Sequence, residues 1–169
     1  MDLNQSTLRG ILAQITSVDQ KFIVPKQGNW WNPQEQLIKP DTWCAYQIRS
    51  NKPRVVPFYT PGTKNNTRVN RATVEKIATI DLQFVGPQSE DIAQSVALWP
   101  LRSDVAAAFK TVNGAVMLND MQAISSIYYQ DGNNSVMAWN VTIEVLWYQV
   151  VETSQTGMPS VQLNGKINN

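Results

Sequence analysis

The apolar positions between residues 74 and 110 change from a period of two to a helical period, which predicts a strand followed by a helix. In the first half, apolar residues alternate with polar ones, as in a strand with one buried face: Ala78, Ile80, Leu82 and Phe84. Gly86-Pro87 then interrupts the pattern, because glycine adopts turn dihedrals and proline cannot donate to a sheet ladder. The next apolar residues recur at helical spacing: Ile92, Ala93, Val96 and Trp99. We expect this helix, capped by Ser89, to lie against the strand.

One further helix is predicted before this unit and another after it. Residues 4–18 carry an apolar stripe of Leu8, Ile11, Leu12 and Ile15, with Ser6 or Thr7 as the cap. Pro100 should break the chain after the central helix, because it removes a hydrogen bond and clashes with the preceding turn. A second apolar face then follows, and Asn113-Gly114 ends it: Leu101, Val105, Ala108 and Phe109.

The remaining periodic segments predict strands. They are residues 42–50, 115–117, 123–130 and 135–151, while residues 19–40 read as irregular. The last strand has one apolar face of Trp139, Val141, Ile143, Val145 and Trp147. Its opposite face begins polar and becomes apolar at Leu146, Tyr148 and Val150, so we expect its far half to be covered on both sides, by an element of this chain or of a neighbour.

These elements predict an α+β fold: a single domain, mainly an antiparallel sheet with helices packed on one face. We place this domain at residues 1–151, with a long projecting basic loop or hairpin at about 50–73 and an extended C-terminal tail at 152–169. The tail is rich in Ser, Thr, Gln, Asn and Gly, yet residues 158–163 alternate weakly. Such a segment can add a strand to the sheet edge of a neighbour.

Composition changes this picture mainly by what it excludes. The chain has 169 residues, 43% of them hydrophobic, and a formal net charge of +1, which argues against a global field that gathers nucleic acid or anionic membrane. The chain contains no histidine, and we find no Gly-rich phosphate loop and no paired carboxylates suited to catalysis. The single cysteine, Cys44, reads as a small buried hydrophobe. We therefore predict a protein that is not an enzyme and that needs no cofactor or metal.

Positive charge is concentrated in one part of the chain. Seven of the 14 basic residues fall between positions 49 and 76, where Glu75 is the only acid. They are Arg49, Lys52, Arg54, Lys64, Arg68, Arg71 and Lys76. This arm is predicted to dock on an acidic protein or on a phosphate backbone, and a merely solvated loop is the alternative.

The adjacent Trp30 and Trp31 are a second candidate for partner binding. Neighbouring side chains of an extended backbone point in opposite directions, so both cannot face the core. One is therefore expected at a surface or a partner, since Trp is enriched at interface hot spots. The polar N-terminus predicts no signal peptide, and no apolar run reaches the length of a membrane span, so we expect folding in a cytoplasm.

The order of these elements resembles that of small phage neck and tail-terminator proteins, which form rings that cap tail tubes. The resemblance spans residues 42–151 and rests on three segments. They are Ala78-Thr79-Ile80-Asp81-Leu82-Gln83-Phe84-Val85-Gly86 leading into Asp91-Ile92-Ala93, then Leu101-Arg102-Ser103-Asp104, and finally Val141-Thr142-Ile143-Glu144-Val145.

The resemblance implies a structural virion protein without catalysis or cofactor, assembled in the host cytoplasm and located in the tail or neck. It implies a homo-hexameric ring that caps the tail tube and forms the joining surface for the head connector. The implied partners are further copies of the chain, the tail tube protein and head-tail connector proteins, with the sheath protein as a further candidate. Genomic DNA would pass through the lumen without specific binding.

Two alternatives stay open at this point. The chain can be a tail tube or head-closure protein of the same particle. It can also be a nucleic-acid-binding module that uses the arm from Arg49 to Lys76, whose affinity for duplex DNA would then fall steeply with salt.

Overall fold

The computed structural model describes residues 2–26, 41–64, 67–118, 125–131 and 134–154. The elements follow in this order: α1 (Gln5–Thr16), the 3₁₀ turn η1 (Gln20–Phe22), β1 (Ile23–Pro25), β2 (Trp43–Pro53), β3 (Phe58–Lys64), β4 (Thr67–Val85), α3 (Ser89–Ser95), η3 (Val96–Leu101), α4 (Ser103–Lys110), β5 (Gly114–Val116), β6 (Ser125–Asp131) and β7 (Asn134–Ser154). Among these elements, no helix is long and apolar enough to cross a membrane.

The strands form one seven-stranded sheet. Its main path has the order β1-β2-β4-β7-β5, and β3 and β6 pair with β4 and β7 beside this path. All pairs are antiparallel except β1 with β2. The long strands β4 and β7 pair from Val69 opposite Ser154 to Val85 opposite Ala138. On the other side of β4, β3 pairs with its first part and β2 with its second part. On the other side of β7, β6 and β5 pair with successive parts.

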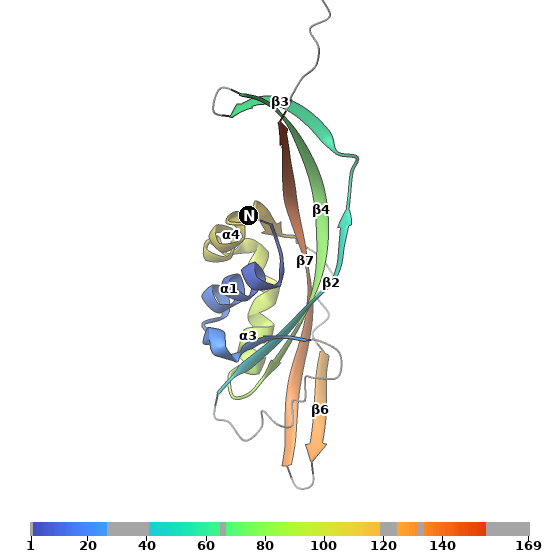
Figure 1. Cartoon of the computed structure of the whole chain (residues 1–169). Coiled ribbons are helices and arrows are strands. Elements are labelled where there is room, and N and C mark those ends of the chain that lie inside the picture. The colour runs from blue at the N-terminus through green and yellow to red at the C-terminus, as the bar shows by residue number, and fades with distance from the viewer. Residues whose placement is uncertain (1, 27–40, 65–66, 119–124, 132–133, 155–169) are drawn as a thin grey trace, which may run out of the picture.

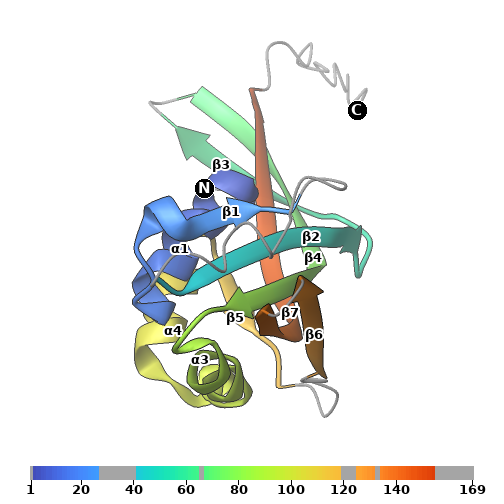
Figure 2. The ribbon, with the colours of Figure 1, turned by 90° about the horizontal axis from the view of Figure 1, so that it is seen from below.

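The helices cover one face of this sheet, and only its middle (Figure 1). Alternate residues of β4 and β7 face the helices and are buried, as the period of two requires: Ala78, Ile80, Leu82, Phe84, Val141, Ile143, Val145 and Trp147. They pack with the apolar stripes of α1 and α4 in one core cluster. Figure 2 shows the same layering from below. The predicted α+β fold, with an antiparallel sheet and helices on one face, is confirmed.

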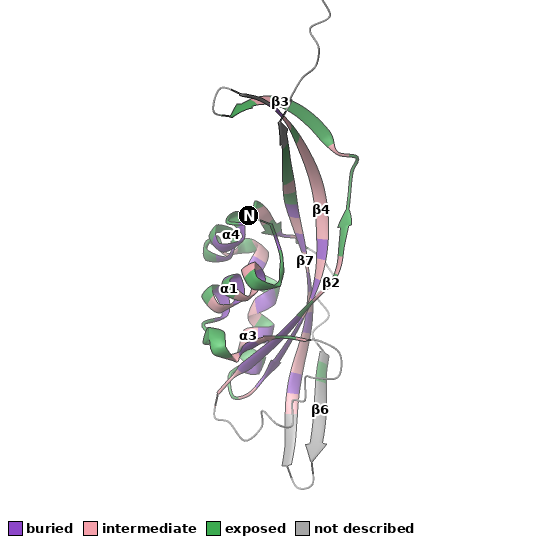
Figure 3. Ribbon diagram, in the orientation of Figure 1, coloured by how far each residue is buried: buried purple, intermediate pink, exposed green. Residues whose placement is uncertain are grey.

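Both ends of the sheet extend beyond the helices (Figure 1). At one end, β6 and β7 form a hairpin that pairs down to Asp131 opposite Asn134. The register leaves two residues between these strands. At the other end, β3, β4 and β7 form a three-stranded extension. Figure 3 shows that burial is concentrated under the helices and that β3 is exposed.

The extension corrects the strand boundaries expected from the sequence. The arm at about 50–73 is largely strand: β2 continues to Pro53, β3 spans Phe58–Lys64, and β4 begins at Thr67. At the C-terminal side, β7 continues to Ser154, past the strand end predicted at residue 151. The short β1, with η1 before it, lies in the stretch read as irregular, and three of the described residues there pair with β2.

The helix ends differ from the prediction in two details. Asn4, not Ser6 or Thr7, caps α1: its side-chain oxygen accepts from the Thr7 N–H at 3.0 Å, and the Thr7 hydroxyl accepts from the Asn4 N–H at 2.9 Å. This reciprocal pair is a capping box. Ser89 is the first residue of α3 and not its cap, because its hydroxyl donates backwards to the Gly86 carbonyl at 2.7 Å.

Pro100 breaks the helix as predicted. The α-helix ends at Ser95, a 3₁₀ segment carries Val96 to Leu101, and α4 begins at Ser103. Leu101 is 76% exposed and does not belong to the buried face of Val105, Ala108 and Phe109, which corrects its expected core role. A 3₁₀ segment turns by about 120° per residue, so the phase carried from the preceding helix is lost before α4.

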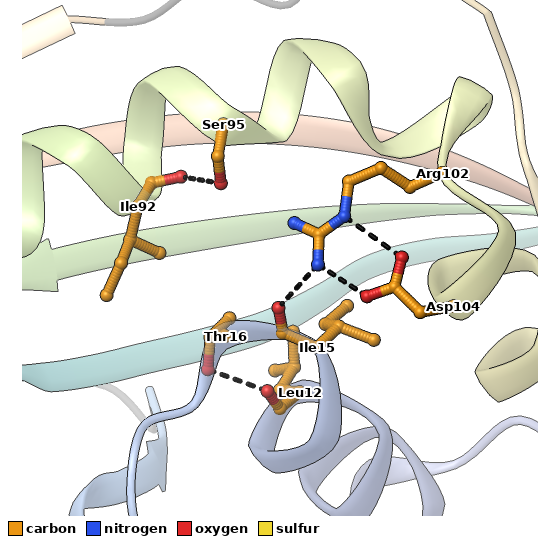
Figure 4. Close-up of polar contacts among 7 residues, drawn as sticks. All are labelled: Leu12, Ile15, Thr16, Ile92, Ser95, Arg102 and Asp104. Carbon is orange, nitrogen blue, oxygen red and sulfur yellow. Dashed lines mark hydrogen bonds and ion pairs between the residues drawn. The ribbon is translucent and has the colours of Figure 1, made fainter.

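Arg102 holds this junction against α1 (Figure 4). Its guanidinium donates to both carboxylate oxygens of Asp104 and, at 3.4 Å, to the carbonyl of Ile15 near the end of α1. The Arg102 hydrogen bond holds the pKa of the Asp104 carboxyl below its usual value. The Leu101-Arg102-Ser103-Asp104 segment therefore joins two helices of the covering layer.

Candidate partner-binding surface

The extension of the sheet beyond the helices carries the candidate partner-binding residues. We call it the distal sheet and define it as residues 54–64, 67–75 and 148–154. The residues of the distal sheet include a set of large apolar side chains that are exposed to solvent: Val55 46%, Val56 85%, Phe58 50%, Tyr59 71%, Tyr148 36%, Val150 45% and Val151 46%. Large exposed apolar surface on a folded protein is typical of contact sites for other proteins.

Strand register assigns the side chains of β3 and β7 in this set to two faces. Phe58, Thr73 and Val150 are aligned across β3, β4 and β7, on the face away from the helices. The next row, Tyr59, Ala72 and Val151, lies on the helix side, beyond the point that the helices cover. The expected cover on both sides of the far half of β7 is therefore not supplied by the described residues.

Arg49 is positioned by an irregularity of β2. Ile48 pairs with Ile80 and Ser50 with Thr79, so Arg49 is the extra residue of a β-bulge. Its guanidinium donates to both oxygens of Asp81, at 2.7 and 2.6 Å. The Thr142 hydroxyl also donates to Asp81 at 2.8 Å. This bidentate pair fixes Arg49 across the sheet on the face away from the helices.

Arg54 belongs to a second cluster on the same face. Its guanidinium lies 3.3 Å from a carboxylate oxygen of Glu75, whose other oxygen accepts from the Tyr148 hydroxyl at 3.0 Å. The hydrogen bond to Glu75 raises the pKa of Tyr148 above its usual value. An exposed aromatic side chain of β7 is thereby linked to β4.

Lys64 and Arg71 share one carboxylate at the end of the distal sheet. The Lys64 Nζ lies 2.7 Å from Glu152 and the Arg71 Nε 2.9 Å from it. These two hydrogen bonds, that of Lys64 first, hold the pKa of the Glu152 carboxyl below its usual value. The arrangement joins β3, β4 and β7, since each strand contributes one residue.

The other predicted residues have different placements. Lys52 is exposed, and no carboxylate of the described residues forms an ion pair with it. Lys76 lies on the helix side, with its Nζ 5.3 Å from the Trp147 ring. Arg68 pairs with Thr63 through the backbone, and its side chain lies outside the described set. Trp30 and Trp31 lie outside the described residues.

The sequence reasoning missed the acidic side of this surface. Asp81 and Glu152 lie outside the interval of residues 49–76, yet the sheet brings them to its basic side chains. Pairing across the sheet reduces the positive field of the arm without removing it. Exposed ion pairs of this kind contribute little stability. A partner's carboxylate can therefore take the place of Asp81 or Glu152 beside a basic side chain at small cost in free energy.

No three metal-ligating side chains gather in the part of the chain that the structure describes. What the described surface offers is exposed apolar side chains, basic groups and strand edges. These features make the distal sheet suited to contact with other protein surfaces.

A sequence model of the phage neck terminator protein family matches residues 6–169. The chain therefore belongs to the phage neck terminator protein family, which confirms the resemblance. A search of curated proteins found no match. Neck terminator proteins are structural components of the virion, and membership implies contact with other tail and head proteins.

Proposed function

We propose that this protein is the tail terminator: copies form a homo-hexameric ring that caps the tail tube and presents the joining surface for the head connector. One observation carries the proposal beyond the family. The sheet is longer than its helical cover, and its distal part exposes Phe58, Tyr59 and Val151, which the described residues of one copy do not bury. Burying apolar area of this kind favours association by about 25 cal/mol per Å² before the entropy of assembly is subtracted.

The proposed mechanism is geometric. A closed ring uses the stacking surface of the last tube layer and offers a different surface on its opposite side, so tube growth ends where the ring binds. The ring assembles in the host cytoplasm and then becomes part of the virion neck. Its partners are further copies of the chain, the tube protein and the connector proteins, with the sheath protein as another candidate. DNA passes through the lumen without specific contacts.

In this proposal the basic side chains dock on an acidic surface of the adjoining ring. Arg49, Arg54, Lys64 and Arg71 are all partly exposed while they hold their carboxylates, with side-chain exposures of 62, 51, 62 and 44%. Lys52 lies on the same face, because it pairs with Ile77, which is on the same face of β4 as Asp81 and Glu75. Complementary charge of this type sets orientation and association rate more than affinity. Trp30 and Trp31 remain candidates for the same contacts.

Tube growth tests the proposal. Purified tube protein is polymerised with and without this protein, and the tubes are measured by electron microscopy. We expect short tubes that carry one or two added rings at an end. Long tubes of unchanged length, or incorporation of the protein along the whole tube, would contradict the proposal, and the second result would favour a tube protein.

A charge reversal tests the docking surface in the same assay. Lys52→Glu should weaken capping and make it less sensitive to salt, because Lys52 has no ion pair to lose among the described residues. Lys110→Glu is the matched control, since Lys110 is exposed at the end of α4 in the helical layer. Equal effects of the two substitutions would argue against a role for this face.

A further inference from the structure

The outer edge of β7 is open where the strand enters the distal sheet. The Met117 N–H donates to the Glu144 carbonyl at 2.8 Å, and the Tyr148 N–H donates to the Asn113 carbonyl at 3.1 Å. The backbone N–H and C=O groups of the even-numbered residues of β7 therefore point away from β4. Because this direction repeats every second residue, the N–H and C=O groups of Val150 and Glu152 also point outward. No described strand pairs with them.

The opposite edge of the distal sheet is blocked. Lys64 pairs with Thr67 across a two-residue connection, so these two residues exchange hydrogen bonds as in a tight hairpin. The backbone groups of Pro61, three residues away, consequently point outward from β3. Proline has no N–H to offer, and its presence on an edge is a common protection against strand pairing. Of the two edges, only that of β7 can accept a strand without interruption.

The side chains beside the open edge favour an apolar strand as its occupant. Val150 and Val151 lie on opposite faces of β7, and each is almost half exposed, at 45 and 46%. An added strand would cover both. On the helix side it would also extend the row of Tyr59, Ala72 and Val151.

The chain itself contains a segment that fits this edge. Residues 155–169 follow directly after β7, and the family match includes them. Within them, Pro159, Val161 and Leu163 alternate with Met158, Ser160 and Gln162. Pro159 fits only with its nitrogen turned away from β7, which turns the N–H groups of Ser160 and Gln162 toward β7. Residues 155–163 can span about 30 Å when extended, enough to reach a neighbouring molecule.

We propose that residues 158–163 of one copy add as an antiparallel strand to the open edge of β7 at Val150–Ser154 of the next copy. This inference rests on the proposed ring and names the contact that closes it. The tail and the edge are different surfaces, so each copy gives one and receives one, as a heterologous ring contact requires. With Val161 opposite Val151, the side chains of Val161 and Leu163 lie on the face of Val151, next to the apolar row on the helix side.

Disulfide trapping between two different copies tests this contact. Full-length Val151→Cys protein is mixed with full-length Val161→Cys protein under mild oxidation, and cross-linked species are separated on a non-reducing gel. We expect a heterodimeric product, because side chains at non-hydrogen-bonded antiparallel positions approach within disulfide reach. The native Cys44 is fully buried and does not compete. Leu98→Cys, at an exposed position of the helical layer, is the control and should give no product with Val161→Cys.

Two further measurements separate the possible outcomes. Native mass spectrometry of the unmodified protein reports whether a ring forms at all. A ring without the cross-link would overturn the strand contact and leave the proposed function standing. A monomer without the cross-link would overturn both. A double Val151→Cys, Val161→Cys protein that closes only within one chain would show a hairpin instead of an exchange, which also overturns the contact between copies.

A substitution in the tail gives an independent test that leaves the described fold unchanged. Gln162→Pro removes an N–H that the proposal directs to β7, and it should reduce the ring population at least tenfold at a fixed protein concentration. Gln162→Ala keeps the N–H and should assemble like the unmodified protein. Equal assembly of the two variants would overturn the proposed register.

Discussion

At the scale of single residues, Gly86 holds the turn between β4 and α3. Its φ of +115° is a conformation that residues with a side chain rarely adopt. A Cβ at this position would lie 2.7 Å from the Asp41 carbonyl oxygen and 2.9 Å from the Thr42 Cα. The strand and the helix can therefore meet at this angle only with glycine between them.

Substitution of this glycine should be costly. Gly86→Ala is expected to lower the free energy of unfolding by about 1–3 kcal/mol, through backbone strain and overpacking. Gly10→Ala is the matched control, since a Cβ at Gly10 meets nothing within 4 Å and lies on a helix. The control should stabilise the protein by about 0.5–1 kcal/mol. Urea unfolding of both variants measures the two effects, and a neutral Gly86→Ala would contradict the packing described for the turn.

The cap of α1 makes a second prediction for single residues. Asn4→Ala removes the side-chain oxygen that accepts from the Thr7 N–H, and it should cost about 1 kcal/mol of stability. Ser6→Ala should change stability by less than about 0.5 kcal/mol, since an exposed residue inside the helix caps nothing. Thermal unfolding distinguishes the two, and an equal loss for Ser6→Ala would restore the original prediction for the cap.

At the scale of secondary-structure elements, the apolar period predicted the covered parts of the sheet and the β6–β7 hairpin, but not β3 or the first part of β4. Ala78, Ile80, Leu82 and Phe84 alternate with polar residues because helices cover one face there. Residues 70–73 of β4 lie beyond the helical cover and none of them is buried, so polar side chains are tolerated there and the period disappears. The same lack of cover hides β3, which contains Pro61 and Gly62 and reads as a turn.

The pairing of Glu152 with β3 and β4 gives a pH prediction for these elements. Because its pKa is lowered in the folded protein, this carboxylate stabilises the distal sheet at pH values above its ordinary pKa. That contribution is lost as the pH falls through the lowered value. NMR titration should find the Glu152 pKa below that of an unpaired glutamate. Lys64→Met should raise it, while Lys110→Met should not, and an ordinary pKa in the unmodified protein would contradict the described pairing.

At the scale of the whole molecule, the fold class could be predicted from the sequence more fully than the candidate site. Helix stripes and the covered parts of the two long strands follow from local periodicity, which depends on burial within one copy, and the Pro100 break follows from the chemistry of proline. The candidate site depends on which distant residues the sheet aligns. Arg49 lies 32 positions from Asp81 in the sequence, and Lys64 lies 88 positions from Glu152, so no local sequence pattern predicts these pairs. Leu101 was misassigned because a 3₁₀ segment resets the helical phase.

Assembly is the central claim, and native mass spectrometry tests it most directly. The purified full-length protein is measured alone and after mixing with tail tubes that lack a terminator. We predict a closed species of six copies, each of 19.0 kDa, either alone or released from the tubes. A protein that stays a monomer under both conditions, at concentrations where the tubes are intact, would contradict the proposed ring.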